Sequence, residues 1–153
     1  MASTAANRSD LLATWAAAHP GLGAVGIDVA DVGRLRRLVE RWGDQVLRHL
    51  FTGEERASLR GRRGLRWQSV AGRFAAKEAV RKVLASRGRV SSWTEVEVLS
   101  GEHGQPFVVL HGRARTAAEQ CGFNAFLLSI SHERGVAVAI ALAVRCELPE
   151  AAD

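Results

Sequence analysis

Residues 69–84 read SVAGRFAAKEAVRKVL. Good helix formers fill this segment and no proline interrupts it, so it predicts a single helix. At about 100° per residue, one side of this helix carries the apolar residues expected to face a core: Ala76, Ala79, Val80, Val83 and Leu84. Glu78 and Lys82 lie nearly opposite, with only Ala71, Ala75 and Phe74 beside them. Such a pair is most often an exposed i,i+4 ion pair worth about 0.3–0.5 kcal/mol, but its small neighbours would also let a ligand approach closely.

The segment GAVGIDVA, residues 23–30, alternates in the manner of a half-buried strand. We expect its apolar residues to pack inward: Val25, Ile27 and Val29. Asp28 would then point to the other face, where Gly26 and Ala30 leave space around its carboxylate. The sequence therefore predicts a second accessible acid, on an element separate from the helix at 69–84.

Residues 32–42, VGRLRRLVERW, predict a helix that Asp31 caps at its start and Gly43 ends. Its expected buried stripe is Leu35, Leu38, Val39 and Trp42. A second stripe consists of Arg34, Arg37 and Arg41, and Glu40 is the only acid inside the helix. Charged helix faces are usually just solvated, but these unpaired arginines favour a docking surface for an acidic partner.

The remaining segments predict an α+β fold. In FTGEE, Thr52 and Glu55 have the spacing of a capping box. Strands are predicted at TEVEV and FVVL, joined by the turn GEHGQP, and at FLLSIS and VAVAIALAV, joined by SHERG. We expect a single domain at residues 23–147, an antiparallel sheet with a long packed helix, flanked by an N-terminal extension (1–22) and a C-terminal tail (148–153). No GxGxxG or Walker pattern occurs.

Net charge, the length of apolar runs and cysteine spacing limit the kinds of function that this chain can have. The 153 residues carry a net charge of +5, which favours an acidic partner. No apolar run approaches the roughly 18 residues that a membrane span needs. The two cysteines have no metal-binding or redox spacing, so we expect free thiols in the reducing cytoplasm. Nucleic-acid binding remains an alternative on charge alone, although the chain lacks tyrosine and any recognised binding motif.

Three features suggest one site: Asp28 on a strand, Glu78 with Lys82 on a helix, and the SISH segment ending at His132. Magnesium typically takes one or two carboxylates and completes its shell with water and phosphate oxygens. A lysine one turn from Glu78 could neutralise charge on a transferring phosphoryl group. Each residue also has an ordinary structural explanation, so the pattern is suggestive.

Four segments in this order resemble the holo-acyl-carrier-protein synthases of the 4'-phosphopantetheinyl transferase superfamily: GIDVADVGRL, FTGEE, AGRFAAKEAVRKVL and SISHERGVAVAIA. The resemblance runs from about Ala24 to Val144. It implies transfer of 4'-phosphopantetheine from coenzyme A to a serine of an acidic acyl carrier protein, with release of 3',5'-ADP. It also implies a homotrimer whose sites lie between subunits, and no role for nucleic acid or membrane.

The resemblance also implies residue roles. Asp28 and Glu78 would hold Mg²⁺, and Lys82 would contact the pyrophosphate of coenzyme A; these three are the expected catalytic residues. The coenzyme A phosphates would meet Arg73 and His132. The residues expected near the adenine are Gly104 and Pro106, and those expected to bind the carrier protein are Arg34, Arg37 and Arg41.

The sequence leaves alternatives for the proton acceptor and for the acceptor protein. The proton acceptor for the serine is either a water on the metal or a nearby carboxylate such as Glu78. The acceptor protein is a fatty-acid carrier, a polyketide carrier or another. The segment ASRGRVSSW, residues 85–93, departs from the glycine-rich turn of the family, and Asp44 lies among the basic residues. An inactive relative that only docks carrier proteins is a third alternative, which the intact set of two carboxylates and a lysine weakens.

Overall fold

The structure is a computed structural model that describes residues 21–85 and 92–145. The predicted tail, all but two residues of the predicted extension, and most of the unusual segment 85–93 lie outside this part of the chain. The predicted boundaries of the extension and tail therefore stay predictions.

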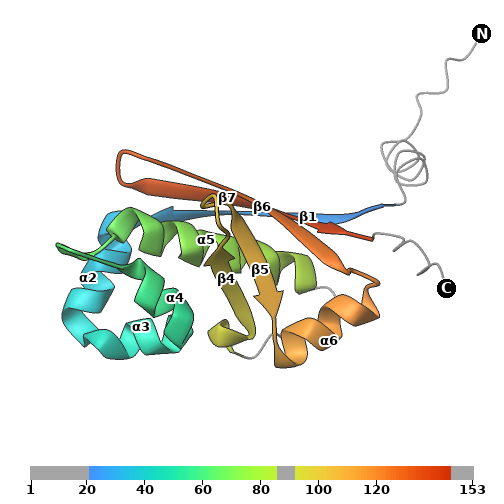
Figure 1. The fold of residues 1–153 in the computed structure, drawn as a ribbon, viewed down its shortest axis with the longest axis horizontal. Helices are drawn as coiled ribbons and strands as arrows, with labels where there is room; N and C mark the ends of the chain where they lie inside the picture. The colour runs from blue at the N-terminus through green and yellow to red at the C-terminus, as the bar shows by residue number, and fades with distance from the viewer. Residues whose placement is uncertain (1–20, 86–91, 146–153) are drawn as a thin grey trace, which may run out of the picture.

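The described chain contains helices and antiparallel strands in the mixed order of an α+β fold, as predicted (Figure 1). The first half contains β1 (Leu22–Asp31), α2 (Val32–Trp42), α3 (Asp44–Leu50), α4 (Gly53–Leu59), the short pair β2 (Arg60–Gly61) and β3 (Gly64–Leu65), and α5 (Trp67–Leu84). The second half contains the 3-10 turn η1 (Trp93–Glu95), β4 (Val96–Ser100), β5 (Pro106–Leu110), α6 (Gly112–Gln120), β6 (Ala125–Glu133) and β7 (Val136–Val144).

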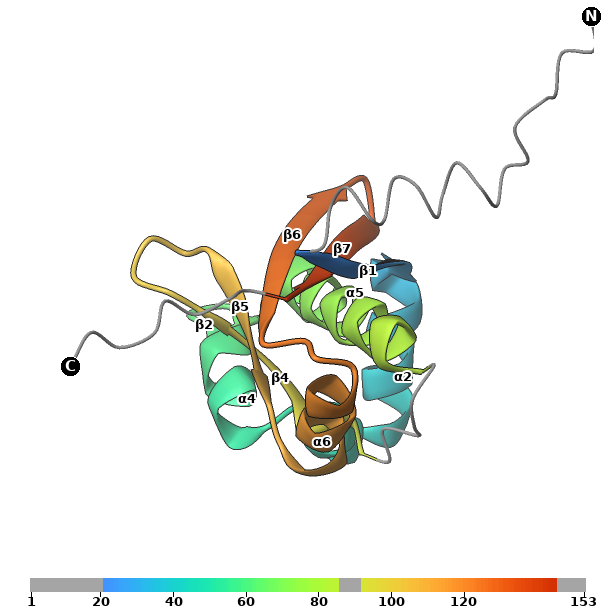
Figure 2. The ribbon, with the colours of Figure 1, turned by 90° about the vertical axis from the view of Figure 1, so that its right-hand side faces the viewer.

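Helix α5 lies at the centre of the molecule. On one side it packs against an antiparallel sheet of order β1-β7-β6, and on the other it meets the β4–β5 hairpin and α2 (Figure 2). The hairpin predicted around SHERG is confirmed: Arg134 and Gly135 connect β6 to β7 with φ of 47° and 85°. Because both residues adopt positive φ, this tight connection matches the right-handed twist of the strands.

The predicted orientation of β1 is wrong. Val25, Ile27 and Val29 are 64%, 54% and 61% exposed, whereas the face carrying Asp28 turns toward α5. The strand predicted from the alternation of residues 23–30 is confirmed, but alternation alone does not say which face of the strand is covered. Here the small residues face the helix, because only they let strand and helix backbones approach closely.

Gly26 shows how close that approach is. A Cβ built at this position would lie 2.1 Å from the carbonyl oxygen of Ala79 on α5. The space beside Asp28 that the sequence assigned to a ligand is therefore filled by the helix on this side. Ala71 and Ala75, expected to keep room for a ligand, are also fully buried and pack in the same cluster as Ala137 and Ala139 of β7.

The predicted core face of α5 is confirmed, since each of its five apolar residues is buried. The helix is covered on further sides as well, which explains its many small residues.

The predicted caps are also correct: Asp31 Oδ1 accepts a hydrogen bond from the Arg34 amide at 2.5 Å, and Thr52 and Glu55 form a reciprocal capping box. The expected buried stripe of α2 is only partly right, because Leu38 is 40% and Trp42 59% exposed.

A buried ion pair ties α4 to α5. Lys77 Nζ donates to both oxygens of Glu55 at 2.9 and 2.7 Å, and both side chains are fully buried. Burial lowers the pKa of Lys77, while the Glu55 carboxylate opposes this shift. Glu55 also accepts a hydrogen bond from the Val98 amide at 3.0 Å, so the same carboxylate connects β4 to α4 and α5. Removing one partner of such a pair leaves a buried charge without compensation, which typically costs about 3–5 kcal/mol.

Candidate functional site

Asp28 meets Lys82 at the contact between β1 and α5. Lys82 Nζ donates to Asp28 Oδ1 at 2.8 Å and to the carbonyl oxygen of Ile27 at 2.8 Å. The Asp28 side chain is 16% exposed and that of Lys82 is 52% exposed. The strand residue and the helix residue predicted to share one site are therefore brought together by the fold.

Glu78 lies one turn before Lys82 on α5, yet these two residues do not pair with each other. Instead, Arg81 Nε lies 3.3 Å from Glu78 Oε1. The Arg81 guanidinium in turn stacks over the Trp93 ring, 4.4 Å from its centroid. The ordinary explanation of Glu78 and Lys82 as an i,i+4 ion pair is thus wrong, because each of the two expected metal ligands has its own cation.

The donor set fits a magnesium ion whose shell is completed by substrate. Among residues 21–85 and 92–145, no group of three or more His, Cys, Asp or Glu side chains could hold a metal by itself. Asp28 and Glu78 offer two carboxylates from two elements, and the cations contact only one oxygen of each. Two carboxylates with remaining oxygen lone pairs, together with phosphate oxygens, match the coordination that Mg²⁺ prefers.

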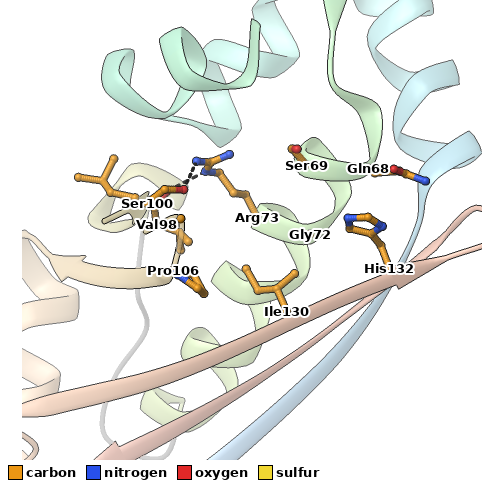
Figure 3. Close-up of a pocket in the computed structure, with 11 residues that line it drawn as sticks. Gln68, Ser69, Gly72, Arg73, Val98, Ser100, Pro106, Ile130 and His132 are labelled. Atoms are coloured by element: carbon orange, nitrogen blue, oxygen red, sulfur yellow. Dashed lines mark hydrogen bonds between the residues drawn. The ribbon is translucent and has the colours of Figure 1, made fainter. Parts of the chain in front are cut away.

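A separate pocket of about 210 Å³ lies between α5, the β4–β5 hairpin and β6 (Figure 3). It gathers the four residues predicted to bind the nucleotide part of coenzyme A: Arg73, Gly104, Pro106 and His132. Sequence reasoning missed other lining residues, among them Gln68, Ser69 and Ser100. Ser69 lies two residues before the AGRFAAKEA segment, but no pattern in the sequence indicated that the first turn of α5 borders a pocket.

Arg73 is anchored at the wall of this pocket. Its Nε donates to the carbonyl oxygen of Val98 at 2.9 Å and its Nη2 to Ser100 Oγ at 3.1 Å (Figure 3). Burial lowers the pKa of Arg73, and the charge of Glu55 opposes this effect. A guanidinium held in this way, with little water around it, attracts an anion more strongly than a solvated one.

Asp28 and His132 lie on opposite edge strands of the sheet, β1 and β6. Asp28 is paired in register with Ala139 of β7, which in turn is paired with Ile130 of β6, a wall of the pocket. Two strand spacings separate β1 from β6 by about 10 Å. The pocket lining includes none of Asp28, Glu78 and Lys82. Within one chain, Asp28, Glu78 and Lys82 therefore lie apart from the pocket, and we call these two groups of expected site residues the two half-sites.

A groove of about 700 Å³ runs along α2, and we call it the arginine groove. Its lining includes Asp31, Arg34, Leu35, Arg37, Leu38, Arg41, Trp42, Phe74 and Trp93. Within the part of the chain that the structure describes, none of its three arginines forms an ion pair. Glu40 pairs with Arg36 at 2.7 Å, and Asp44 pairs with Arg48 and Arg60. The predicted basic stripe is thus an accessible surface with apolar residues beside it.

No helix in the two described ranges is long and apolar enough to cross a membrane.

Comparisons with known proteins identify the family. The family model of the 4'-phosphopantetheinyl transferase superfamily matches residues 24–141. A holo-[acyl-carrier-protein] synthase of Desulforudis audaxviator is 43% identical over 120 residues, covering 78% of this chain and 91% of the relative. The crystal structure of a holo-ACP-synthase from Plasmodium yoelii is similar with a TM-score of 0.71 and 29% identity, covering 82% of this chain and 97% of that one.

An ACPS–CoA complex from Chronobacterium ammoniagenes is also similar, with a TM-score of 0.67 and 29% identity over 78% of this chain and 94% of that one. Sequence and fold thus agree with the resemblance stated from the four motifs, and both extend over most of the described residues. The chain belongs to the 4'-phosphopantetheinyl transferase superfamily and is a transferase.

Proposed function

We propose that this chain transfers 4'-phosphopantetheine from coenzyme A to a serine hydroxyl of an acyl carrier protein, in a magnesium-dependent reaction that releases 3',5'-ADP. The observation that carries the proposal is the pairing of Lys82 with Asp28, on the same side of α5 as Glu78. This pairing supports a site formed by two carboxylates and a cation from two elements. The names of the similar proteins, including one bound to coenzyme A, support the same reaction.

The nucleotide end of coenzyme A suits the pocket between α5 and the β4–β5 hairpin. Arg73 and His132 would meet its phosphates, and the turn carrying Gly104 and Pro106 would border its adenine. Arg73 is already held by Val98 and Ser100, so it needs little reorganisation when an anion arrives. Preformed contacts of this kind reduce the entropy lost on binding.

Magnesium would be held by Asp28 and Glu78, and when bound it would supply positive charge to the phosphate oxygens. Lys82 would neutralise charge on the pyrophosphate, and its half-exposed ammonium can reach a phosphate without leaving the site. The serine oxygen forms a bond to the β-phosphorus while the pyrophosphate P–O bond breaks and 3',5'-ADP leaves. For the serine proton we propose the Glu78 carboxylate, which Arg81 contacts through Oε1 alone.

The arginine groove is the proposed docking surface for the carrier protein. Arg34, Arg37 and Arg41 have no acidic partner among the described residues, so an acidic carrier would supply one. Leu38 and Trp42 add exposed apolar area beside the arginines. Charge complementarity steers association, while buried apolar residues contribute most of the affinity.

We also propose the homotrimer. The outer face of the sheet carries exposed apolar residues from all three strands: Val25, Ile27, Val29, Leu127, Val136 and Ile140. A contiguous apolar face of this kind is typical of an interface. The separation of the two half-sites within one chain also supports a site completed by a neighbouring copy.

As its compartment we propose the cytoplasm, where coenzyme A and carrier proteins are available together.

The reaction can be tested by mass spectrometry. Incubation with coenzyme A, Mg²⁺ and apo carrier proteins of the fatty-acid and polyketide classes should add a phosphopantetheine mass to at least one of them. Asp28→Asn should reduce the rate by about 10²-fold or more, the scale of losing one charge-stabilising group. Glu119→Gln, which alters an exposed acid on α6, should leave the rate unchanged. Absence of the mass shift with every carrier, or full activity of Asp28→Asn, would refute the proposal.

A further inference from the structure

Arg81 is placed by an aromatic stack more than by hydrogen bonds. Its guanidinium lies 4.4 Å from the centroid of the Trp93 ring. Trp93 is itself stacked on Phe74, with 5.0 Å between the ring centroids and an interplanar angle of 25°. By contrast, Arg81 Nη1 is buried and has no hydrogen-bond partner among the residues that the structure describes. The aromatic rings therefore determine where this charge lies.

Phe74, Glu78 and Arg81 follow one another at i, i+4 and i+7 on the same face of α5, where side chains one turn apart are neighbours. Trp93 contacts the first and the last of these residues. Glu78 thus lies between two side chains that Trp93 holds in place. The Glu78 and Arg81 side chains are only 28% and 24% exposed, so neither is free to move into solvent without losing these contacts.

The contact between Arg81 and Glu78 is long and single. Nε lies 3.3 Å from Oε1, whereas a bidentate arginine–carboxylate pair would have two shorter contacts. A carboxylate held by one long contact keeps its orientation, but it can still bind a cation of higher charge. Asp28, by comparison, is held by a shorter contact of 2.8 Å to Lys82.

We propose that Arg81, held against Trp93, is a positioning residue that orients Glu78 and competes with the divalent cation for it. This inference rests on the proposed metal site. The guanidinium beside Oε1 of Glu78 would repel a metal held by the other oxygen, so we expect the enzyme without coenzyme A to bind metal weakly. Phosphate oxygens of coenzyme A would add ligands for the metal, and they would also offer the guanidinium a second anion.

Binding of Mn²⁺ alone to the coenzyme A-free protein, followed by the electron paramagnetic resonance of the free ion, tests this competition. Arg81→Met keeps the length of the side chain but removes the charge. It should tighten Mn²⁺ binding about two- to fivefold, the scale of one partly exposed ion pair. Arg81→Lys should stay close to the wild type. Arg115→Met removes the same charge from an exposed i,i+4 pair on α6 and should have no effect.

Trp93→Leu provides a second, independent variant. It should tighten Mn²⁺ binding in the wild-type background, because Arg81 is no longer held beside Glu78. In the Arg81→Met background it should change nothing further, since the two residues act through one contact. Unchanged or weaker binding by Arg81→Met, or additive effects of the two substitutions, would overturn the role of Arg81. If Asp28→Asn binds Mn²⁺ as well as the wild type, the proposed metal site itself is wrong.

Discussion

At the scale of single residues, the fold determines which of several possible partners a charged side chain contacts. Lys82 could pair with Glu78 on its own helix, but it reaches across to β1 and contacts Asp28 instead. The spacing of Glu78 and Lys82 in the sequence is compatible with both arrangements. The strand contact is favoured because Ile27 also offers a carbonyl oxygen at 2.8 Å, so the ammonium gains two acceptors.

Glu97 is a second residue whose partners come from distant segments. Thr52 Oγ1 donates to its Oε1 at 2.5 Å, and His111 Nε2 lies 2.9 Å from its Oε2. Burial by itself would raise the pKa of Glu97, but the hydrogen bonds from Thr52 and His111 outweigh it and bring the pKa below its ordinary value of 4.5. Nothing in the sequence connects these residues, which lie on three separate elements.

This shift predicts a pH dependence of stability. Because the folded-state pKa of Glu97 is lowered, its contribution to the free energy of unfolding is present above pH 4.5 and is lost as the pH falls through the folded-state value. Urea unfolding between pH 6 and pH 3 should show a smaller loss of stability for Glu97→Gln than for the wild type. The exposed Glu119→Gln variant should follow the wild type. An identical pH profile for Glu97→Gln would contradict this assignment.

At the level of elements, the close packing of β1 on α5 determines the position of Asp28. The sequence predicted both elements correctly, including the start of α2 at Asp31, because caps and periodicity are local signals. It predicted the wrong face of β1 as the covered one. That choice depends on the small residues of the facing helix and of β7, which lie far away in the sequence.

Gly26→Ala tests this packing. The added Cβ would lie 2.1 Å from the Ala79 carbonyl oxygen, which belongs to a helix backbone and cannot move easily. We expect a loss of about 3 kcal/mol in the free energy of unfolding, the upper range for overpacking a core. Gly53→Ala is the matched control, because it begins α4 and no atom lies within 4 Å of the new Cβ. Equal stability of the two variants in urea would show that the close approach is unimportant.

At the level of the whole molecule, one chain displays two half-sites and an uncovered apolar sheet face. The trimer that the resemblance implies would explain both features, since burial of that face would bring the carboxylates of one copy toward the pocket of another. Burial of apolar surface contributes roughly 25 cal/mol per Å², so exposed apolar side chains on all three strands are costly to leave in water.

Ile27→Glu should disrupt this assembly, because it places a charge in the centre of the apolar face. Light scattering should show the mass of one chain for this variant and of three chains for the wild type, with activity lost in parallel. Phe107→Glu, on β5 outside that face, should keep the mass of the wild type. A trimeric Ile27→Glu would rule out this face as the interface.

Mixing two inactive variants then tests whether neighbouring copies share a site. Asp28→Asn alters the carboxylate half-site, and His132→Glu places a repelling charge in the anion pocket. If each site combines halves from two chains, exchange of subunits between the variants should restore part of the activity. No recovery in a mixture that demonstrably exchanges subunits would contradict shared sites.

The sequence by itself determined most of the elements, their caps, the α+β class and the family, because these depend on local periodicity and on motifs of consecutive residues. Helix α3 and the short strands β2 and β3 were not predicted. The sequence also predicted the residues of both half-sites, and their roles stay predictions. Only the tertiary structure decided that the small face of β1 is buried, that Asp28 pairs with Lys82, and that Arg81 contacts Glu78 while it stacks on Trp93. These outcomes depend on which backbones pack closely and which charges then lie within reach, and packing between distant segments leaves no periodic signal along the chain.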